Sequence, residues 1–380
     1  MNKKPTTPTS KKQDKATAEV LKIGIDVHKK QYVFVCQYDG QSPKSPQKMD
    51  PDKFLTWIGK QAEQVGEIHT CYEAGCFGFV LHRKLEAIGV KNLVVRPRDW
   101  DEYGSKVKTD SRDARELCGC LDRYLAGNDR ALTAVCVPTL EQECQRALSR
   151  QRETLAKEKK RLQNIGVSAG IYHGVDLPSD WWKSKTFEAL KGSLPEYMLR
   201  ILTPYQTILE TLHRQLREAT AREERKAARA LPVGLGALTA SVLDQEFVDY
   251  SRFSNRREVS SFTGLCPSES SSGGKRLQGS ISKHGNPRIR HMLIEAVWRM
   301  FSFQPNYKPI LKWKEKLRDG IPTSAKKKKM AVAIAREFAV DWWRIQTGVI
   351  KPEDVGLKVG YPTSYAARAA LEGRVSKIYA

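Results

Sequence analysis

Short apolar runs alternate with amphipathic segments through the first hundred residues. Two β-branched or aromatic runs within residues 21–37 flank a polar turn, which predicts a β-hairpin. Residues 50–65 have helical spacing, with Asp and Pro in the positions that favour a helix start. Strand patterns at 68–72 and 92–95 lie on either side of a helical pattern at 79–88. This order predicts an α/β domain with a mixed sheet.

Long helices dominate the pattern after residue 110. Residues 111–126 are helical, residues 139–163 carry leucines at seven-residue spacing, and residues 197–229 carry a second apolar stripe. Two such stretches favour either an antiparallel helical arm or a dimerising coiled coil, and the pattern does not choose between them. Between them we expect an irregular segment that contains Gly170, Gly174, Pro178, Trp181 and Trp182.

These patterns divide the chain into five parts. We expect a disordered basic tail, an α/β catalytic domain, a helical or coiled-coil arm, a mainly α domain and a second tail, at residues 1–19, 20–135, 136–229, 230–348 and 349–380. Residues 230–243 read as a Pro-Gly-Gly turn that opens a helix. Such a turn suits a backbone contact with phosphate and equally suits a tight corner between two helices.

The charge balance points to a polyanionic partner. Lys and Arg number 65 against 43 Asp and Glu, for a formal charge of +22. Residues 261–329 alone hold 15 Lys or Arg against 4 acidic residues, as expected of a surface that binds nucleic-acid phosphates. Since no run of 18 apolar residues occurs, we expect a cytoplasmic, nucleoid-associated protein without a membrane partner.

Four acidic residues occur where apolar strands and a helix end or begin. Asp26 ends the apolar run IGID, Glu73 ends the strand containing a tyrosine, and Asp110 and Asp113 share one helix face. Carboxylates that converge repel one another unless a cation lies between them, and oxygen ligands suit Mg²⁺ or Mn²⁺. Each acid alone has an ordinary structural explanation, whereas their order is more specific. His28 is better explained as a turn residue than as a general base.

Three motifs carry a family resemblance: GIDVHK at residues 24–29, YEAG at 72–75 and KTDSRDAREL at 108–117. With these, residues 21–343 resemble the DEDD transposases of the IS one-ten group. The resemblance is strongest to the IS eleven-eleven branch, whose members are bridge-RNA-guided recombinases. It implies an RNase H/RuvC-like α/β domain, followed by a helical coiled-coil arm and a mainly α transposase domain. It also implies a metal tetrad at Asp26, Glu73, Asp110 and Asp113.

The same resemblance assigns a nucleophilic serine to the segment 264–298, at Ser272, with the register within 270–272 left open. Neighbouring glycines let this residue approach a phosphate, and Lys275 and Arg276 can neutralise the charge that develops there. From composition alone, a flexible loop that contacts phosphate without covalent chemistry is the favoured explanation.

Three further basic residues follow a Gly-Asn-Pro turn or lie just before it. We expect Lys283, Arg288 and Arg290 to contact the DNA or RNA backbone, although single charges of this kind are more often simply solvated.

These observations lead to one functional hypothesis and two rivals. The resemblance implies a recombinase that binds an element end and a target in DNA, cuts through a phosphoserine ester, and rejoins the ends. It further implies a guide RNA and a homodimer or tetramer that combines one subunit's tetrad with another's serine. The main rival is a RuvC-like metal-dependent nuclease or junction resolvase that uses water. The other rival is a non-catalytic nucleic-acid-binding scaffold.

Overall fold

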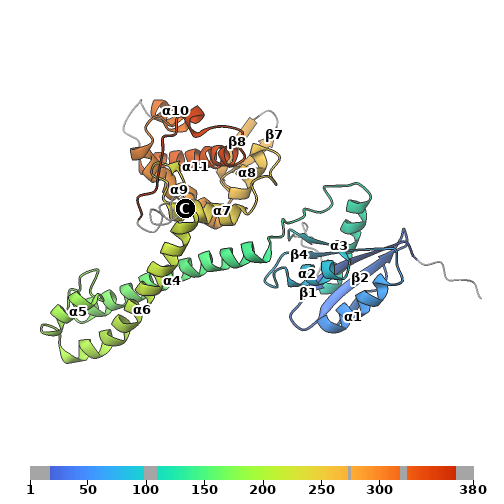
Figure 1. Ribbon diagram of the computed structural model, residues 1–380, viewed down its shortest axis with the longest axis horizontal. Helices are drawn as coiled ribbons and strands as arrows, with labels where there is room; N and C mark the ends of the chain where they lie inside the picture. The colour runs from blue at the N-terminus through green and yellow to red at the C-terminus, as the bar shows by residue number, and fades with distance from the viewer. Residues whose placement is uncertain (1–17, 98–108, 273–274, 317–322, 365–380) are drawn as a thin grey trace, which may run out of the picture. The chain divides into compact units, whose positions relative to one another are not determined.

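The chain forms two compact units, Met1–Val137 and Pro138–Ala380. The computed structural model describes residues 18–97, 109–272, 275–316 and 323–364, without the side chains of 271, 272, 275 and 276 (Figure 1). Most of the predicted basic tail and the end of the second predicted tail lie outside the described residues. The division into five parts stays a prediction.

A mixed five-stranded sheet forms the centre of the first unit. Its strands are β1 (Val20–Val27), β2 (Tyr32–Tyr38), β3 (Gln47–Met49), β4 (Glu67–Glu73) and β5 (Lys91–Val95), in the order β3-β2-β1-β4-β5. The β1–β2 and β2–β3 pairs are antiparallel, whereas β1–β4 and β4–β5 are parallel. The predicted hairpin and mixed sheet are therefore confirmed.

Helices cover both faces of this sheet. Helices α1 (Pro51–Ala62) and α2 (Val80–Ala87) share a core with Phe34 on one face. On the other face, α3 (Asp110–Leu125) packs its Ala114 against Val33. Phe34 and Val33 are neighbours on β2, so the alternation of a strand supplies both cores. The backbone N–H of Asp52 donates to Asp50 at the start of α1, as the sequence predicts.

Gly24 lets α3 approach the sheet closely. An ideal Cβ atom at this position of β1 would lie 2.9 Å from the Cα atom of Cys118 and closer still to the α3 backbone. A side chain here would push the helix away from the sheet. The missing Cβ therefore fixes how near the first turn of α3 can lie to the end of β1.

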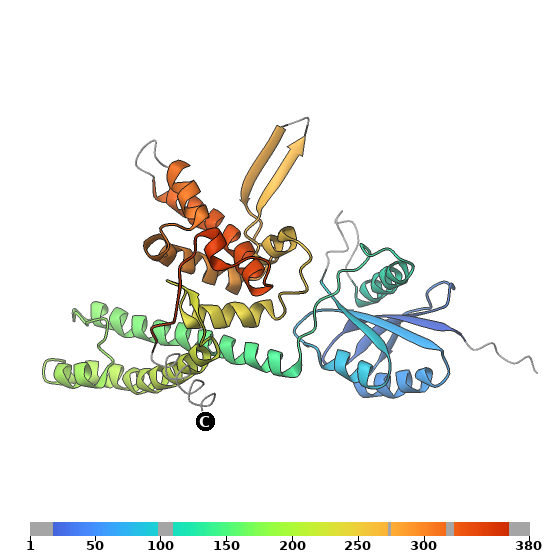
Figure 2. The same ribbon diagram turned by 45° about the horizontal axis from the view of Figure 1, so that its top comes forward.

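Two long helices begin the second unit, α4 (Leu140–Tyr172) and α6 (Glu196–Lys226), and the short α5 (Ser184–Lys191) lies between them in the chain. Helices α4 and α6 run side by side in opposite directions (Figures 1 and 2). Their shared core includes Leu162, Leu202 and Leu209. Within one chain the pair is thus an antiparallel helical arm, and a coiled coil between chains stays a prediction.

Helix α4 is longer than the sequence pattern predicts. We expected Gly170 in an irregular segment, but the helix continues through Gly166 and Gly170 to Tyr172. A Cβ atom at Gly166 would collide with the ring of Trp181, and one at Gly170 would lie 2.7 Å from the carbonyl oxygen of Val175. These glycines let the returning chain pack on the helix, a tertiary cause that helical periodicity does not contain.

A helical domain with two small sheets completes the second unit. Its largest elements are α7 (Ala237–Phe247), α8 (Arg256–Thr263), α9 (Pro287–Phe303), α10 (Lys308–Lys316) and α11 (Ser324–Gln346). Leu293, Phe338 and Trp342 belong to their common core. The mainly helical C-terminal region is thus confirmed. A hairpin of β7 (Pro267–Ser272) and β8 (Lys275–Ile281) extends away from these helices (Figure 2).

The end of the described chain packs into this core. We expected a peripheral tail from residue 349, but Leu357 is buried and β9 (Val359–Gly360) pairs with β6 (Leu231–Pro232) after a short 3-10 helix, η1 (Pro352–Val355). The segment shows no periodic pattern of apolar residues, because only Leu357 and the two paired residues of β9 hold it to the domain. None of the helices in the described ranges is both long and apolar enough to span a membrane.

A buried carboxylate joins three helices of the second unit. Glu246 of α7 has a side chain that is 1 % exposed and accepts hydrogen bonds of 3.0 Å from Nε and Nη2 of Arg150 on α4. Asn286, the N-cap of α9, donates to it at 2.8 Å, and Arg146 lies 3.6 Å away. Burial alone would raise the pKa of Glu246, but these donors and charges outweigh burial and lower it.

Replacing Gly24 tests whether the close approach of α3 holds the first unit together. We expect Gly24→Ala to destabilise it by about 1–3 kcal/mol, the usual cost of overpacking, because only backbone atoms lie in the path of the new methyl group. Hydrogen exchange of the β1 and α3 amides, measured by mass spectrometry on the intact protein, should speed up. Gly59→Ala is the control, since it faces open space within α1. Equal exchange in both variants would contradict the packing argument.

Candidate active site

Three chain segments bring acidic side chains to one edge of the sheet. Ile25 of β1 pairs with Tyr72 of β4 in parallel register, so the next residues, Asp26 and Glu73, lie where two neighbouring strands end. Helix α3 begins at Asp110 on the face of the sheet that Gly24 leaves open. The sequence argument for convergence therefore has a structural basis at the strand ends.

The register between β1 and α3 decides which residues meet. Two residues of a strand advance about 6.6 Å and four residues of a helix about 6 Å, so alternate strand residues face every fourth helix residue. At one end of this match Lys22 forms an ion pair with Asp122. At the other end His28 lies 3.3 Å from Asp110. Asp26 lies between these ends, on the same face of β1.

The grouped side chains are Asp26, His28 and Asp110. Their ligand atoms all lie within 4.8 Å of one another. Nε2 of His28 is 3.1 Å from Oδ2 of Asp26 and 3.3 Å from Oδ2 of Asp110. His28 was not among the residues that we selected from the sequence, because its nearness to Asp110 depends on α3. Its position two residues after Asp26, on the same strand face, was the available signal.

The electrostatics of this group suit a cation. Burial raises the pKa of Asp26, His28 lowers it, and the negative charges of Asp110 and Asp113 raise it again, with a raised pKa as the result. Two carboxylates and an imidazole nitrogen are ligands that a divalent transition-metal ion accepts. Asp110 is 53 % exposed, so a substrate can reach the group.

Glu73 and Asp113 are not members of the group within 4.8 Å, judged over the described residues. Both are half-buried. Cys71, two residues before Glu73 on β4, donates to the carbonyl oxygen of Leu117, so Glu73 lies on the strand face that α3 covers. Asp113 is close enough to raise the pKa of Asp26. The structure thus groups two of the four predicted acids with His28 and leaves the other two beside them.

The serine-rich segment forms a β-hairpin where we had considered a flexible loop. Ser272 ends β7 and pairs with Lys275, the first residue of β8. The glycines between them, Gly273 and Gly274, lie outside the described residues, as do the side chains of Ser272, Lys275 and Arg276. Ser272 is therefore the last residue of β7 and lies in the last described pair of the hairpin.

Two of the predicted phosphate-binding arginines have partners within the chain. Nε of Arg288 donates to Glu153 on α4 at 2.8 Å. Nη1 of Arg290 donates to the carbonyl oxygens of Thr263 and Lys283, at 3.2 and 3.4 Å. The bonds of Arg290 attach the base of the hairpin to α9, and the bond of Arg288 joins α9 to α4. The side chain of Lys283 is exposed, and the nucleic-acid contacts of all three residues stay predictions.

Two family models match the chain. The model of the DEDD transposases of IS110 type, described as "Transposase", matches residues 23–165, which include the acidic group. The model described as "Transposase IS116/IS110/IS902 family" matches residues 231–311, which include the β7–β8 hairpin.

Curated relatives agree with both models. A putative transposase, y4rJ, of Sinorhizobium fredii is 30% identical over 310 residues, which are 73% of this chain and 77% of the relative. The transposase for insertion sequence element IS1533 of Leptospira borgpetersenii is 27% identical over 73% of this chain and 84% of its own. The transposase for IS1328 of Yersinia enterocolitica is 24% identical over 73% and 83%. The chain is therefore a transposase and belongs to the IS116/IS110/IS902 family.

Proposed function

We propose that this transposase cuts and rejoins DNA with a divalent-metal centre in its first unit and a serine nucleophile in its second. Asp26, Glu73, Asp110 and Asp113 form the metal tetrad of the proposal, and Ser272 is the nucleophile. The observation that carries it is that the carboxylate oxygens of Asp26 and Asp110 and a ring nitrogen of His28 lie within 4.8 Å of one another at the edge of the sheet.

The topology of the first unit supports an RNase H/RuvC-like domain. Its sheet begins with an antiparallel hairpin, continues into parallel strands and has helices on both faces. Asp26 and Glu73 lie at the ends of two central strands, where open α/β sheets place their ligands. This arrangement agrees with the fold that the motifs imply.

The proposed metal is Mg²⁺ or Mn²⁺. Carboxylate oxygens are the ligands that both ions prefer, and the imidazole of His28 favours Mn²⁺ between the two. A bound divalent ion activates the attacking oxygen and stabilises the charge on the leaving oxygen of a phosphodiester. The side chains of Asp26 and Asp110 would hold the ion, with Glu73 and Asp113 beside them.

Ser272 supplies the attacking oxygen in this proposal. The bond between its Oγ atom and phosphorus forms as the bond from phosphorus to the leaving deoxyribose oxygen breaks, and the proton ends on that leaving oxygen. One phosphate ester replaces another, so a hydroxyl of the new DNA partner can reverse the step without ATP. The position of Ser272 at the end of β7, in a hairpin that extends from the helices, supports this role.

A guide RNA and a homodimer or tetramer complete the proposal. The resemblance of the motifs implies both, with the tetrad and the serine acting together in the assembled protein. The formal charge of +22 agrees with a nucleic-acid partner. In the cell, the protein would act on chromosomal DNA in the bacterial cytoplasm.

Asp26→Asn should reduce divalent-ion binding while stabilising the ion-free protein at neutral pH. A carboxyl group with a raised pKa contributes stability below its ordinary pKa of 3.8, and that stability is lost as pH rises through the raised value. In thermal denaturation, MnCl₂ at 100 times its Kd should stabilise the wild type by about 2.7 kcal/mol and the variant by much less. Asp129→Asn, at an exposed site, is the control. Equal stabilisation of Asp26→Asn and wild type would contradict metal binding here.

Ser272→Ala should abolish a covalent protein–DNA adduct. We expect strand cleavage to fall roughly a thousandfold or more, because the nucleophile is lost while DNA binding persists. The adduct is trapped by denaturation and detected on gels with labelled DNA. Ser268→Ala, an exposed serine outside the open register 270–272, is the matched control and should keep the adduct. Cleavage at the wild-type rate by Ser272→Ala, with no adduct formed, would instead support a nuclease that uses water.

Asp113→Ala should abolish transposition in cells and leave DNA binding intact. The tetrad proposal requires this carboxylate for chemistry rather than for affinity. A transposition assay and an electrophoretic mobility shift assay measure the two properties separately. Unchanged transposition would support the non-catalytic scaffold.

A further inference from the structure

A cluster of positive side chains surrounds a buried tryptophan on the helical arm. Trp182 is 3 % exposed, and Nζ of Lys159 lies 4.5 Å from the centre of its ring. The ring of His213 packs against the same tryptophan at 5.1 Å, and Nζ of Lys159 is 3.3 Å from its Nδ1 atom. Lys183 and Arg217 complete the set, which we call the arm basic cluster. It combines residues of α4 and α6 with the residue that caps α5.

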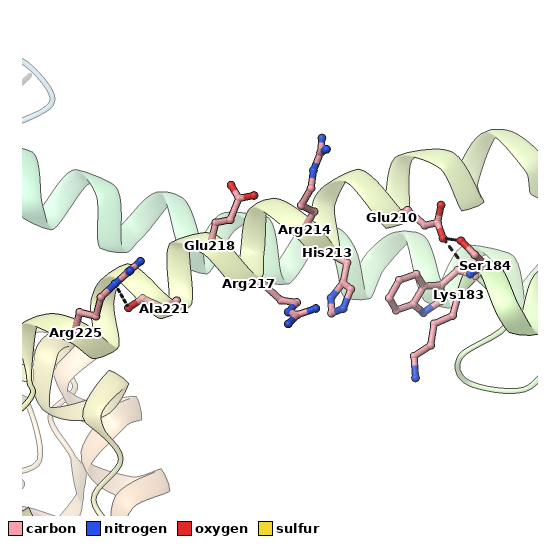
Figure 3. A pocket seen from close by; sticks show the side chains of 10 residues that line it. Lys183, Ser184, Glu210, His213, Arg214, Arg217, Glu218, Ala221 and Arg225 are labelled. Carbon is pink, nitrogen blue, oxygen red and sulfur yellow. Dashed lines mark hydrogen bonds between the residues drawn. The ribbon is translucent and has the colours of Figure 1, made fainter. Parts of the chain in front are cut away.

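The cluster opens into a hollow of about 620 Å³ whose lining includes Trp182, Lys183, His213 and Arg217, together with Arg214 and the carboxylates Glu210 and Glu218. Figure 3 shows the side chains of Lys183, His213 and Arg217 extending to one side of α6, whereas those of Arg214, Glu210 and Glu218 extend to the opposite side. The residue that caps α5 and two residues of α6 therefore direct basic groups to one side of this space.

These groups repel one another. Burial lowers the pKa of His213, and the charges of Lys159, Arg217 and Lys183 lower it further. Burial and the charge of Lys183 lower the pKa of Lys159 as well. Lys183 has an ion-pair partner in Asp180, at 3.2 Å. In the described part of the chain, no carboxylate lies within ion-pair distance of Lys159 or Arg217. The local positive charge is thus only partly balanced by the protein itself.

The shape of the site favours an extended anion. Lys183 and Arg217 are exposed cations whose side chains extend to the same side of α6. Two separate cations of this kind can contact different phosphates of one strand, whereas a single small anion would leave part of the hollow empty. Because the ring of Trp182 is buried, it cannot stack on a base. The cluster is therefore suited to contacts with the phosphates of a nucleic acid and not to recognition of its base sequence.

We propose that the arm basic cluster binds the phosphate backbone of duplex DNA. A transposase has DNA as its substrate, and an arm that holds flanking DNA by its backbone would add affinity at any sequence. The proposal is independent of the serine and of the metal centre. It assigns Lys183 and Arg217 to direct phosphate contacts and Lys159 to the support of that surface over Trp182.

The test compares two double variants of the intact protein that remove the same charge. Lys183→Gln/Arg217→Gln changes the cluster, and Lys185→Gln/Arg200→Gln changes two exposed cations of α5 and α6 that do not line the hollow. Fluorescence anisotropy with a labelled duplex of arbitrary sequence measures Kd between about 50 and 200 mM salt. We expect the cluster variant to bind roughly tenfold more weakly and to lower the slope of log K against log salt by about 1.8. The control should change Kd less than about twofold.

Three outcomes would overturn the proposal. Equal DNA affinity of the two double variants would show that the cluster has no special contact. A loss of affinity for a labelled single-stranded RNA, with duplex affinity unchanged, would assign the cluster to RNA. A change in oligomeric mass by light scattering, without a change in DNA affinity, would assign it to contacts between copies of the chain. Unchanged thermal denaturation of both variants would exclude unfolding as the cause of weaker binding, since the substituted side chains are exposed.

Discussion

The contact between a strand and a helix at Gly24 is the constraint on which the candidate active site depends. Because no Cβ atom separates them, α3 lies with its backbone against β1, and its first turn meets the end of that strand. Strand and helix advance by nearly equal distances over two and four residues, so the match extends from Lys22 with Asp122 to His28 with Asp110. A shift of α3 along β1 would separate the acidic side chains while leaving the sheet intact.

In the second unit, one helical domain supports both the β7–β8 hairpin and the long α4–α6 helical pair. A two-stranded hairpin alone is marginally stable in water, so the attachment at its base matters. Arg290 bonds to the carbonyl oxygens at that base, and Asn286 both caps α9 and bonds to Glu246. Arg288 reaches Glu153 on α4. The residues that we first expected on nucleic acid thus also hold the hairpin to the arm.

Hydrogen bonds between residues close in sequence, such as helix caps, were predictable from the sequence. Contacts between residues far apart in sequence were not. Asp50 at the start of α1 and Asn286 at the start of α9 act through bonds to residues two or three positions away, which a sequence motif contains. By contrast, His28 joins the candidate site only through α3, and Gly170 stays helical because a distant segment packs on it. Leu357 shows the same limit, since a single buried side chain leaves no periodicity. The four acidic residues were selected because residues of one kind recur at strand and helix ends, and the structure groups two of them with His28.

The hydrogen bonds and ion pairs of the buried Glu246 carboxylate have a consequence for how the sequences of related transposases diverge. Its carboxylate is shared by Arg150, Arg146 and Asn286, so loss of one partner leaves charge or polarity stranded in the interior. Changes at such positions are not additive, because each depends on what the others are. We therefore expect these four positions to be conserved together in related sequences, and a substitution at one of them to be accompanied by substitutions at the others.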